Sequence, residues 1–140
     1  MQLRPIQSRL KTALPGLRQV GGSADMVSAM AGAVAVPAAF VLPMGEVGKD
    51  LGLLGQTHQS VAQGFGVLHV VSNRRDAQGS AALDDLEALR TALKLALIGW
   101  VPDAATGEPV TFVSGKLVQF DAEGRLWWLD EFLLNTYWSA

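Results

Sequence analysis

The sequence predicts an α+β fold: a two-layer domain with a mainly antiparallel or mixed β-sheet, two to three helices packed on one face, and a long C-terminal β-hairpin. Three observations predict it. Leucines recur every three or four residues over 80–98, as in an amphipathic helix. Residues 61–71 are apolar on both alternating faces, the pattern of a central strand that is covered on both sides. Two extended apolar runs, 110–120 and 125–138, flank an Asp-Ala-Glu-Gly turn.

The N-terminal part of the chain alternates helical and extended patterns. Leucine and isoleucine recur at helical spacing between a proline suited to a first helical turn and a Pro-Gly stop. Glycines and prolines then separate shorter apolar runs. We expect, in order, a helix over 5–14, a short strand over 17–20, a helix over 24–31 and a buried strand over 38–42.

Residues 44–55 are predicted to form a loop, because glycines and charged residues are interleaved with apolar ones. Apolar residues on such a loop either pack against the domain's own sheet or are kept for a partner. We favour contact with another protein, in which charged side chains set the register and leucines supply affinity. The residues concerned are Glu46, Lys49, Asp50, Leu51, Leu53 and Leu54.

The strand over 61–71 and the helix over 80–98 are expected to build the core. Gly64 and Gly66 fall on one face of the strand, where a neighbouring group is expected to pack closely. The helix has a single leucine stripe, with charged residues off it, so the stripe is expected to lie on the sheet. The stripe consists of Leu83, Leu86, Leu89, Leu93 and Leu97.

After a loop over 102–109, the last strand carries a charged residue where apolar ones are expected. Asp130 shares a face with Trp128, Phe132 and Trp138. A β-bulge or an arginine partner would explain this position. The carboxylates of Asp130 and Glu131 must diverge, so we interpret this pair as belonging to an edge or interface strand rather than to an acid–base site.

Composition bounds the class of protein. The chain has 140 residues, 49% of them hydrophobic and 17% charged, with a net charge of −2 and no cysteine. These values predict one domain over 1–140, and they exclude a disordered chain, a cysteine framework and a nucleic-acid binder that relies on bulk positive charge. The uncharged stretch between Asp25 and Glu46 is divided by Pro37 and Pro43, so we predict no membrane span, and we see no secretory signal.

No motif predicts catalysis, a cofactor or a metal site. The two histidines, His58 and His69, lie eleven positions apart without an acidic neighbour in the sequence. Ser8 begins a bare Ser-x-x-Lys pattern that lacks its companion motifs. The run Arg74, Arg75 and Asp76 could bind an anion, but a solvated turn or an ion pair between subunits explains it better.

The charges are unevenly distributed along the chain. Residues 1–20 contain four basic residues and no acid, a net charge of +4; residues 103–140 contain six acids and two basic residues, a net charge of −4. Opposite poles favour a head-to-tail contact between copies, which closes into a ring or continues as a filament. Equally, the two ends could be neighbours within one fold.

Four stretches in this order resemble the tail terminator proteins of long-tailed bacteriophages over nearly the whole chain. They are "LPGLRQVGGSADM", "PAAFVLPMGE", "GFGVLHVVSNRRDAQGSAALDDLEALRTALKLALIGW" and "GRLWWLDEFLLNTYW". The resemblance depends on the order of elements and on "NRRDAQG" and "LWWLDEF", not on a catalytic signature. It implies a small α/β domain without enzymatic activity or cofactor.

The resemblance also implies the setting in which the protein works. It implies a six-membered ring of the protein itself on the last ring of the tail tube, at the head-proximal end of the virion tail, after assembly in the host cytoplasm. There the ring would stop tube polymerisation and offer a docking surface to the head or neck. The implied partners are other copies, the tail tube protein and a head–tail connector protein. DNA can pass through such a ring, but no specific nucleic-acid binding and no membrane is implied.

Two alternatives stay open at this point. One is another ring-forming connector or neck protein of the same assembly. The other is a small hydrolase or ligand-binding enzyme that uses Ser8, His69 or Asp130. For the terminator function, the candidate interface consists of residues 46, 49–51, 53 and 54, together with Arg74, Arg75, Asp76 and Asp130.

Overall fold

A computed structural model of the protein describes residues 2–52, 54–72 and 80–139, with three helices and five strands within them. The helices are α1 (Arg4–Ala13), α2 (Ser23–Met30) and α3 (Ser80–Leu97). The strands are β1 (Gln19–Gly21), β2 (Ala38–Asp50), β3 (His58–Ser72), β4 (Thr111–Phe120) and β5 (Arg125–Ser139).

The five strands form one mixed sheet in the order β1-β2-β3-β5-β4. β1 runs parallel to β2, and every other neighbouring pair is antiparallel. β4 and β5 form the predicted C-terminal hairpin around a turn in which the backbone N–H of Gly124 donates to the carbonyl oxygen of Asp121. The predicted α+β class is confirmed.

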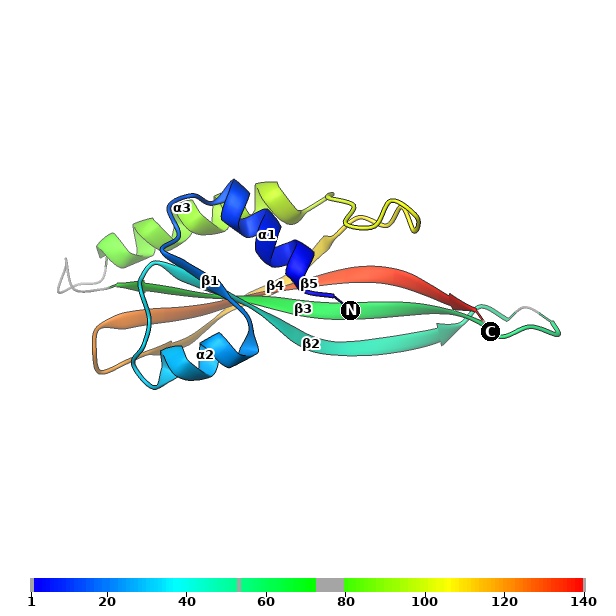
Figure 1. The fold of residues 1–140 in the computed structure, drawn as a ribbon, viewed down its shortest axis with the longest axis horizontal. Helices are drawn as coiled ribbons and strands as arrows, with labels where there is room; N and C mark the ends of the chain where they lie inside the picture. The colour runs from blue at the N-terminus through cyan, green and yellow to red at the C-terminus, as the bar shows by residue number, and fades with distance from the viewer. Residues whose placement is uncertain (1, 53, 73–79, 140) are drawn as a thin grey trace.

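Helices α1 and α3 lie side by side on one face of the sheet, and α2 lies on the opposite face (Figure 1). The main core forms under α1 and α3, where Leu89, Leu93 and Leu97 meet the aromatic and branched residues of the sheet. Leu86 packs in a smaller cluster with Val71, and Leu83 is 51% exposed, so the predicted stripe is buried over part of its length. The largest members of the main core are Ile6, Leu10, Phe65, Leu93, Leu97 and Phe132. Two of the helices therefore pack on one face, as the sequence predicts.

The opposite face has a smaller core under α2. There Ala29 of α2 packs with Phe40, Leu68 and Trp127. This second layer explains why β3 has apolar residues on both faces between Phe65 and Val71, where every residue is buried. The predicted central strand is confirmed.

The glycines of β3 make room for a methionine from β2. A Cβ atom at Gly66 would lie 2.8 Å from Cδ1 of Leu129 and 3.1 Å from Sδ of Met44, and one at Gly64 would lie 3.5 Å from Cβ of Met44. The predicted close packing is therefore confirmed at Gly66, whereas a Cβ atom at Gly64 would make an ordinary van der Waals contact.

The predicted loop over 44–55 is wrong for residues 44–50, whereas residues 51, 52, 54 and 55 lie outside the strands as predicted. β2 continues to Asp50, and its residues pair with β3 as far as Asp50 opposite Gln59. A register shift between Pro43 and Gly45, where Gly45 has a φ of +147°, marks a β-bulge. This bulge interrupts the side-chain alternation that would have revealed the strand, and exposure of every residue from 44 to 50 removes the apolar signal.

The interpretation of β5 as an edge or interface strand is also wrong. β5 lies between β3 and β4, so both of its edges are paired within the subunit. Trp138, predicted to share the buried face, is 65% exposed. It pairs with Gln59 near the end of β5, and this end of the strand runs past the helices (Figure 1). The buried residues of β5 lie in its first part and include Leu126, Trp127 and Phe132.

The leucine stripe of α3 gives a direct test of this core. Leu93→Ala should lower the free energy of unfolding by roughly 2–5 kcal/mol, because it leaves a cavity at a fully buried position. Leu95→Ala, at a position 80% exposed on the same helix, should change it by less than about 0.5 kcal/mol. Urea unfolding of both variants measures the difference, and equal effects would mean that α3 does not pack as described.

Candidate assembly site

The distal halves of β2, β3 and β5 run past the helices and form an arm (Figure 1). The arm comprises residues 45–63, of which 53 is not described, and residues 133–139. The chain turns back between β2 and β3 at its tip, and the backbone N–H of Leu51 donates to the carbonyl oxygen of His58 there. Sheets are stable when a second layer covers at least one face, and the helices cover only the proximal half of this one.

Apolar side chains remain exposed along the arm. Val47 is 71% exposed, Tyr137 55% and Trp138 65%. The cross-strand pairs place Val47 and Tyr137 on the face that α2 covers proximally, and Trp138 on the face of α1 and α3. Exposed aromatic and branched residues on both faces of a sheet are typical of a protein–protein contact.

Five of the residues predicted to contact a partner lie together on the arm. Glu46, Lys49 and Asp50 are exposed strand residues, and Leu51 and Leu54 follow at the tip. Leu54 is fully exposed and Leu51 is 46% exposed, so neither covers the domain's own sheet. The carboxylate of Asp50 accepts a hydrogen bond from the Gly52 backbone N–H at 2.8 Å, and Glu46 accepts one from Gln63 at 3.0 Å.

The remaining predicted residues do not join this group. Leu53 and the run Arg74, Arg75 and Asp76 lie outside the described residues. Asp130 lies on the sheet under α3, and its side chain is fully buried. Its role is therefore internal, and it is not part of the exposed arm.

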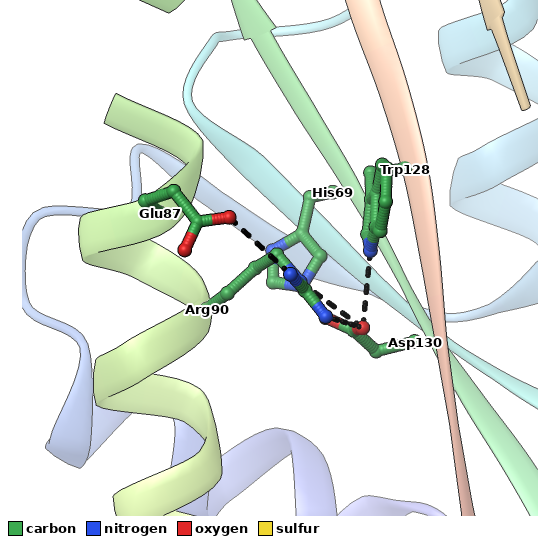
Figure 2. Close-up of polar contacts among 5 residues, drawn as sticks. All are labelled: His69, Glu87, Arg90, Trp128 and Asp130. Atoms are coloured by element: carbon green, nitrogen blue, oxygen red, sulfur yellow. Dashed lines mark hydrogen bonds and ion pairs between the residues drawn. The ribbon is translucent and has the colours of Figure 1, made fainter. Parts of the chain in front are cut away.

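Asp130 is the centre of a buried polar cluster that joins α3 to the sheet (Figure 2). Arg90 of α3 donates two hydrogen bonds to its carboxylate, from Nη2 at 2.9 Å and from Nε at 3.1 Å. Trp128 Nε1 and His69 Nε2 each donate another at 3.0 Å. The guanidinium also lies 4.6 Å from the centroid of the Trp128 ring. The arginine partner considered for Asp130 is thus Arg90.

These contacts keep the carboxylate charged. Burial by itself would raise the pKa of Asp130, but the hydrogen bonds from His69, Arg90 and Trp128 outweigh it and lower the pKa from 3.8 to about 2. Its hydrogen bond to Asp130 in turn raises the pKa of Arg90. Arg90 also reaches Glu87 on the solvent side of α3, at 3.3 Å. The cluster is a fixed ion pair around neutral pH.

Backbone geometry on β4 fits this cluster closely. A Cβ atom at Gly115 would lie 2.5 Å from Oδ1 of Asp130 and 2.8 Å from Nη2 of Arg90. Only glycine leaves space for the ion pair at this position. The sequence alone predicts no role for Gly115 or Arg90, although Arg90 falls three residues before Leu93 on the buried side of the helix, where a cation needs a partner.

The histidine–aspartate pair does not form an accessible catalytic site. His69 and Asp130, 61 positions apart in the chain, are both fully buried, and Nδ1 of His69 has no hydrogen-bond partner. Ser8 is an exposed residue of α1. A substrate could not reach the His69–Asp130 pair in this conformation, so the geometry gives no support to the hydrolase alternative.

Much of the charge in the C-terminal part is used within the subunit. Asp130 pairs with Arg90, and both Asp121 and Glu123 contact Arg125, at 2.7 Å and 3.3 Å. Burial would raise the pKa of Asp121, but hydrogen bonds from Trp127 and Arg125 lower it. Arg125 is already counted in the net charge of −4, so the pairing with Arg90, which lies outside residues 103–140, is the one of these contacts that reduces the acidic pole.

Comparison with known proteins decides the family. Residues 1–139 match the family described as phage tail terminator protein. The chain belongs to this family. No curated protein matches the chain. A chain from the virion of a native gene transfer agent particle has a similar fold, with a TM-score of 0.51 and 14% sequence identity over 95% of each chain.

Membership of the terminator family makes the protein a structural component of the phage tail and of the virion. Among residues 2–52, 54–72 and 80–139, no helix is both long and apolar enough to cross a membrane. In the same ranges, no group of three or more His, Asp and Glu side chains could hold a metal ion.

The close fit at Gly115 predicts a sensitive position. Gly115→Ala should lower the free energy of unfolding by roughly 1–3 kcal/mol, because the methyl group overlaps the Arg90–Asp130 pair. Gly48→Ala is a matched control on β2, since a Cβ atom there would meet nothing closer than Gln59 at 3.8 Å. Denaturant melts should show a loss for the first variant only; a tolerant Gly115 would contradict the packing at the cluster.

The charge of Asp130 predicts a pH dependence. Because its pKa is lower in the folded protein, its stabilisation is present above about pH 4 and is lost as the pH falls towards about 2. The loss should be on the order of 2 kcal/mol. Asp130→Asn removes this titration, so the stability gap between wild type and variant should narrow as the pH falls through that window. A gap that stays constant in urea melts would argue against the lowered pKa.

Proposed function

We propose that the protein closes the tail tube as a ring of identical subunits, six in number, and so stops polymerisation of the tube. The ring's other side then offers a docking surface to the head–tail connector or neck. Membership of the terminator family supports this proposal, and the observation that carries it is the uncovered arm. The proposed assembly takes place in the host cytoplasm, and the ring sits at the head-proximal end of the tail.

The arm supports an assembly function for a physical reason. Half of the sheet has no helical layer of its own, yet it keeps Val47, Leu51 and Leu54 in contact with solvent. Burial of apolar surface contributes about 25 cal/mol of stabilising free energy per Å² removed from water. On the arm, a partner would have to provide the surface that buries these side chains. A ring provides such partners at a fixed position on every subunit.

Another ring-forming neck protein would share this arm, so the two functions differ in what happens to the tube. A terminator controls tube length, and its loss produces overlong tails. A neck protein controls joining, and its loss leaves tails of normal length without heads. Tail length is therefore the decisive measurement.

Replacement of the tip leucines should separate assembly from folding. Leu51→Ser combined with Leu54→Ser should leave the melting temperature of the subunit unchanged, because both residues are exposed. The same variant should fail to close rings in light scattering and should give overlong tails in electron micrographs of infected cells. Leu95→Ser, at an exposed position of α3 away from the arm, is the matched control and should behave as wild type.

Two outcomes would count against the proposal. A large fall in melting temperature for the double variant would place the leucines in the subunit's own core. Tails of normal length that lack heads would instead assign the protein to the neck.

A further inference from the structure

A groove of about 540 Å³ lies beside α3, at the end of the sheet opposite the arm. Its apolar lining comes from Val36 and Pro37 before β2, Val71 near the end of β3, and Leu89 of α3. Two residues of opposite charge, Arg18 and Asp85, also line it, and both are exposed. Among the described residues, the lining of the groove is thus apolar with one cation and one anion.

The tip of the arm has the complementary arrangement. Leu54 is fully exposed, and Leu51 is about half exposed beside it. Lys49 and Asp50 precede them at adjacent strand positions, so their side chains point to opposite faces of the arm. The tip is therefore apolar, with the positive charge of Lys49 on one face and the negative charge of Asp50 on the other. This arrangement complements the apolar groove lined by Arg18 and Asp85.

The tip cannot reach the groove of its own chain. β3 begins at His58 next to the tip, and its other end is Ser72 at the groove. Fifteen residues of strand separate the two, a distance of roughly 50 Å at about 3.3 Å per residue. Any contact between tip and groove therefore joins two molecules.

We propose that the arm tip of one copy docks in the groove of the next copy. Leu54 enters the apolar lining, Asp50 faces Arg18, and Lys49 faces Asp85. The proposal rests on the proposed function, in that it identifies the contact by which the ring closes. Because the two surfaces lie at opposite ends of the subunit, the contact is heterologous, and repetition of it gives a closed ring or a filament.

A charge exchange between two variants tests the pairing. Asp50→Arg places a cation against Arg18, and Arg18→Asp places an anion against Asp50, so each variant alone should self-associate about tenfold more weakly than wild type, or worse. Mixed in equal amounts, the variants should assemble again, because each tip then meets an oppositely charged groove in an alternating ring. Light scattering and analytical ultracentrifugation at low salt measure all four samples.

Arg4→Asp is the control for net charge, since Arg4 is an exposed residue of α1 outside the groove; it should assemble as wild type does. Failure of the mixture to recover, or full assembly of both single variants while wild type forms rings, would overturn the tip-to-groove contact and leave the ring function standing. Normal tail length without the protein would instead overturn the ring function.

Cysteine cross-linking provides a second test that does not require a complete ring. The chain contains no cysteine, so engineered thiols report only the intended contact. Leu54→Cys at the tip mixed with Ala88→Cys in the groove should give a disulfide-linked dimer on mild oxidation. Leu54→Cys mixed with Ser114→Cys, an exposed position on β4, should not. Equal cross-linking in both mixtures would contradict the proposal.

Discussion

The carboxylate of Asp130 is the point at which the helical layer is fixed to the sheet. Four N–H groups donate hydrogen bonds to it: Nε2 of His69 in β3, Nε and Nη2 of Arg90 in α3, and Nε1 of Trp128 in β5 itself. Removal of either partner of a buried ion pair leaves an uncompensated charge, at a cost of roughly 3–5 kcal/mol. A leucine stripe alone would allow α3 to slide or rotate on an apolar surface, whereas the bidentate contact of Arg90 specifies one position. On the neighbouring strand β4, Gly115 leaves the space that this contact occupies, because a Cβ atom there would overlap Asp130 and Arg90.

The subunit has two parts that differ in burial: a proximal body in which helices cover the sheet, and a distal arm that they leave exposed. Proximally, Phe40, Trp127 and Phe132 are buried between layers of helix and sheet. Distally, three strands continue as an arm whose apolar residues face water. Local stability follows buried contacts, so the arm belongs to the least stable part of the isolated subunit. The proposed ring would use this combination, because the body fixes the geometry while the arm is exposed to a neighbouring copy.

The helices and strands of the body can be predicted from the sequence because the patterns that indicate them lie within short stretches of the chain. The leucines of α3 and the two-sided apolar pattern of β3 both report burial directly. The part of the arm over 45–50 is predicted as a loop because an exposed strand has no apolar alternation, and the bulge next to Gly45 interrupts the alternation further. Asp130 was recognised as unusual, but its partner His69 lies 61 positions away, and no local pattern carries that pairing. Arg90 on the buried stripe of α3 was the available signal, since a cation and an anion on two facing apolar surfaces require one another.

The buried ion pair and the proposed docking groove share the helix α3. Leu89 and Asp85 of the groove belong to α3, and Leu89 immediately precedes Arg90. The contact that holds Arg90 on Asp130 therefore also sets where one wall of the groove stands relative to the sheet. In a heterologous assembly, the angle between successive subunits decides whether the ring closes or a filament grows, so a small rotation of that wall would accumulate around the ring. A charged anchor is better suited to this task than an apolar one, because its hydrogen bonds have fixed directions while apolar packing does not. The interior of the subunit thereby sets the geometry of the contact proposed for its surface.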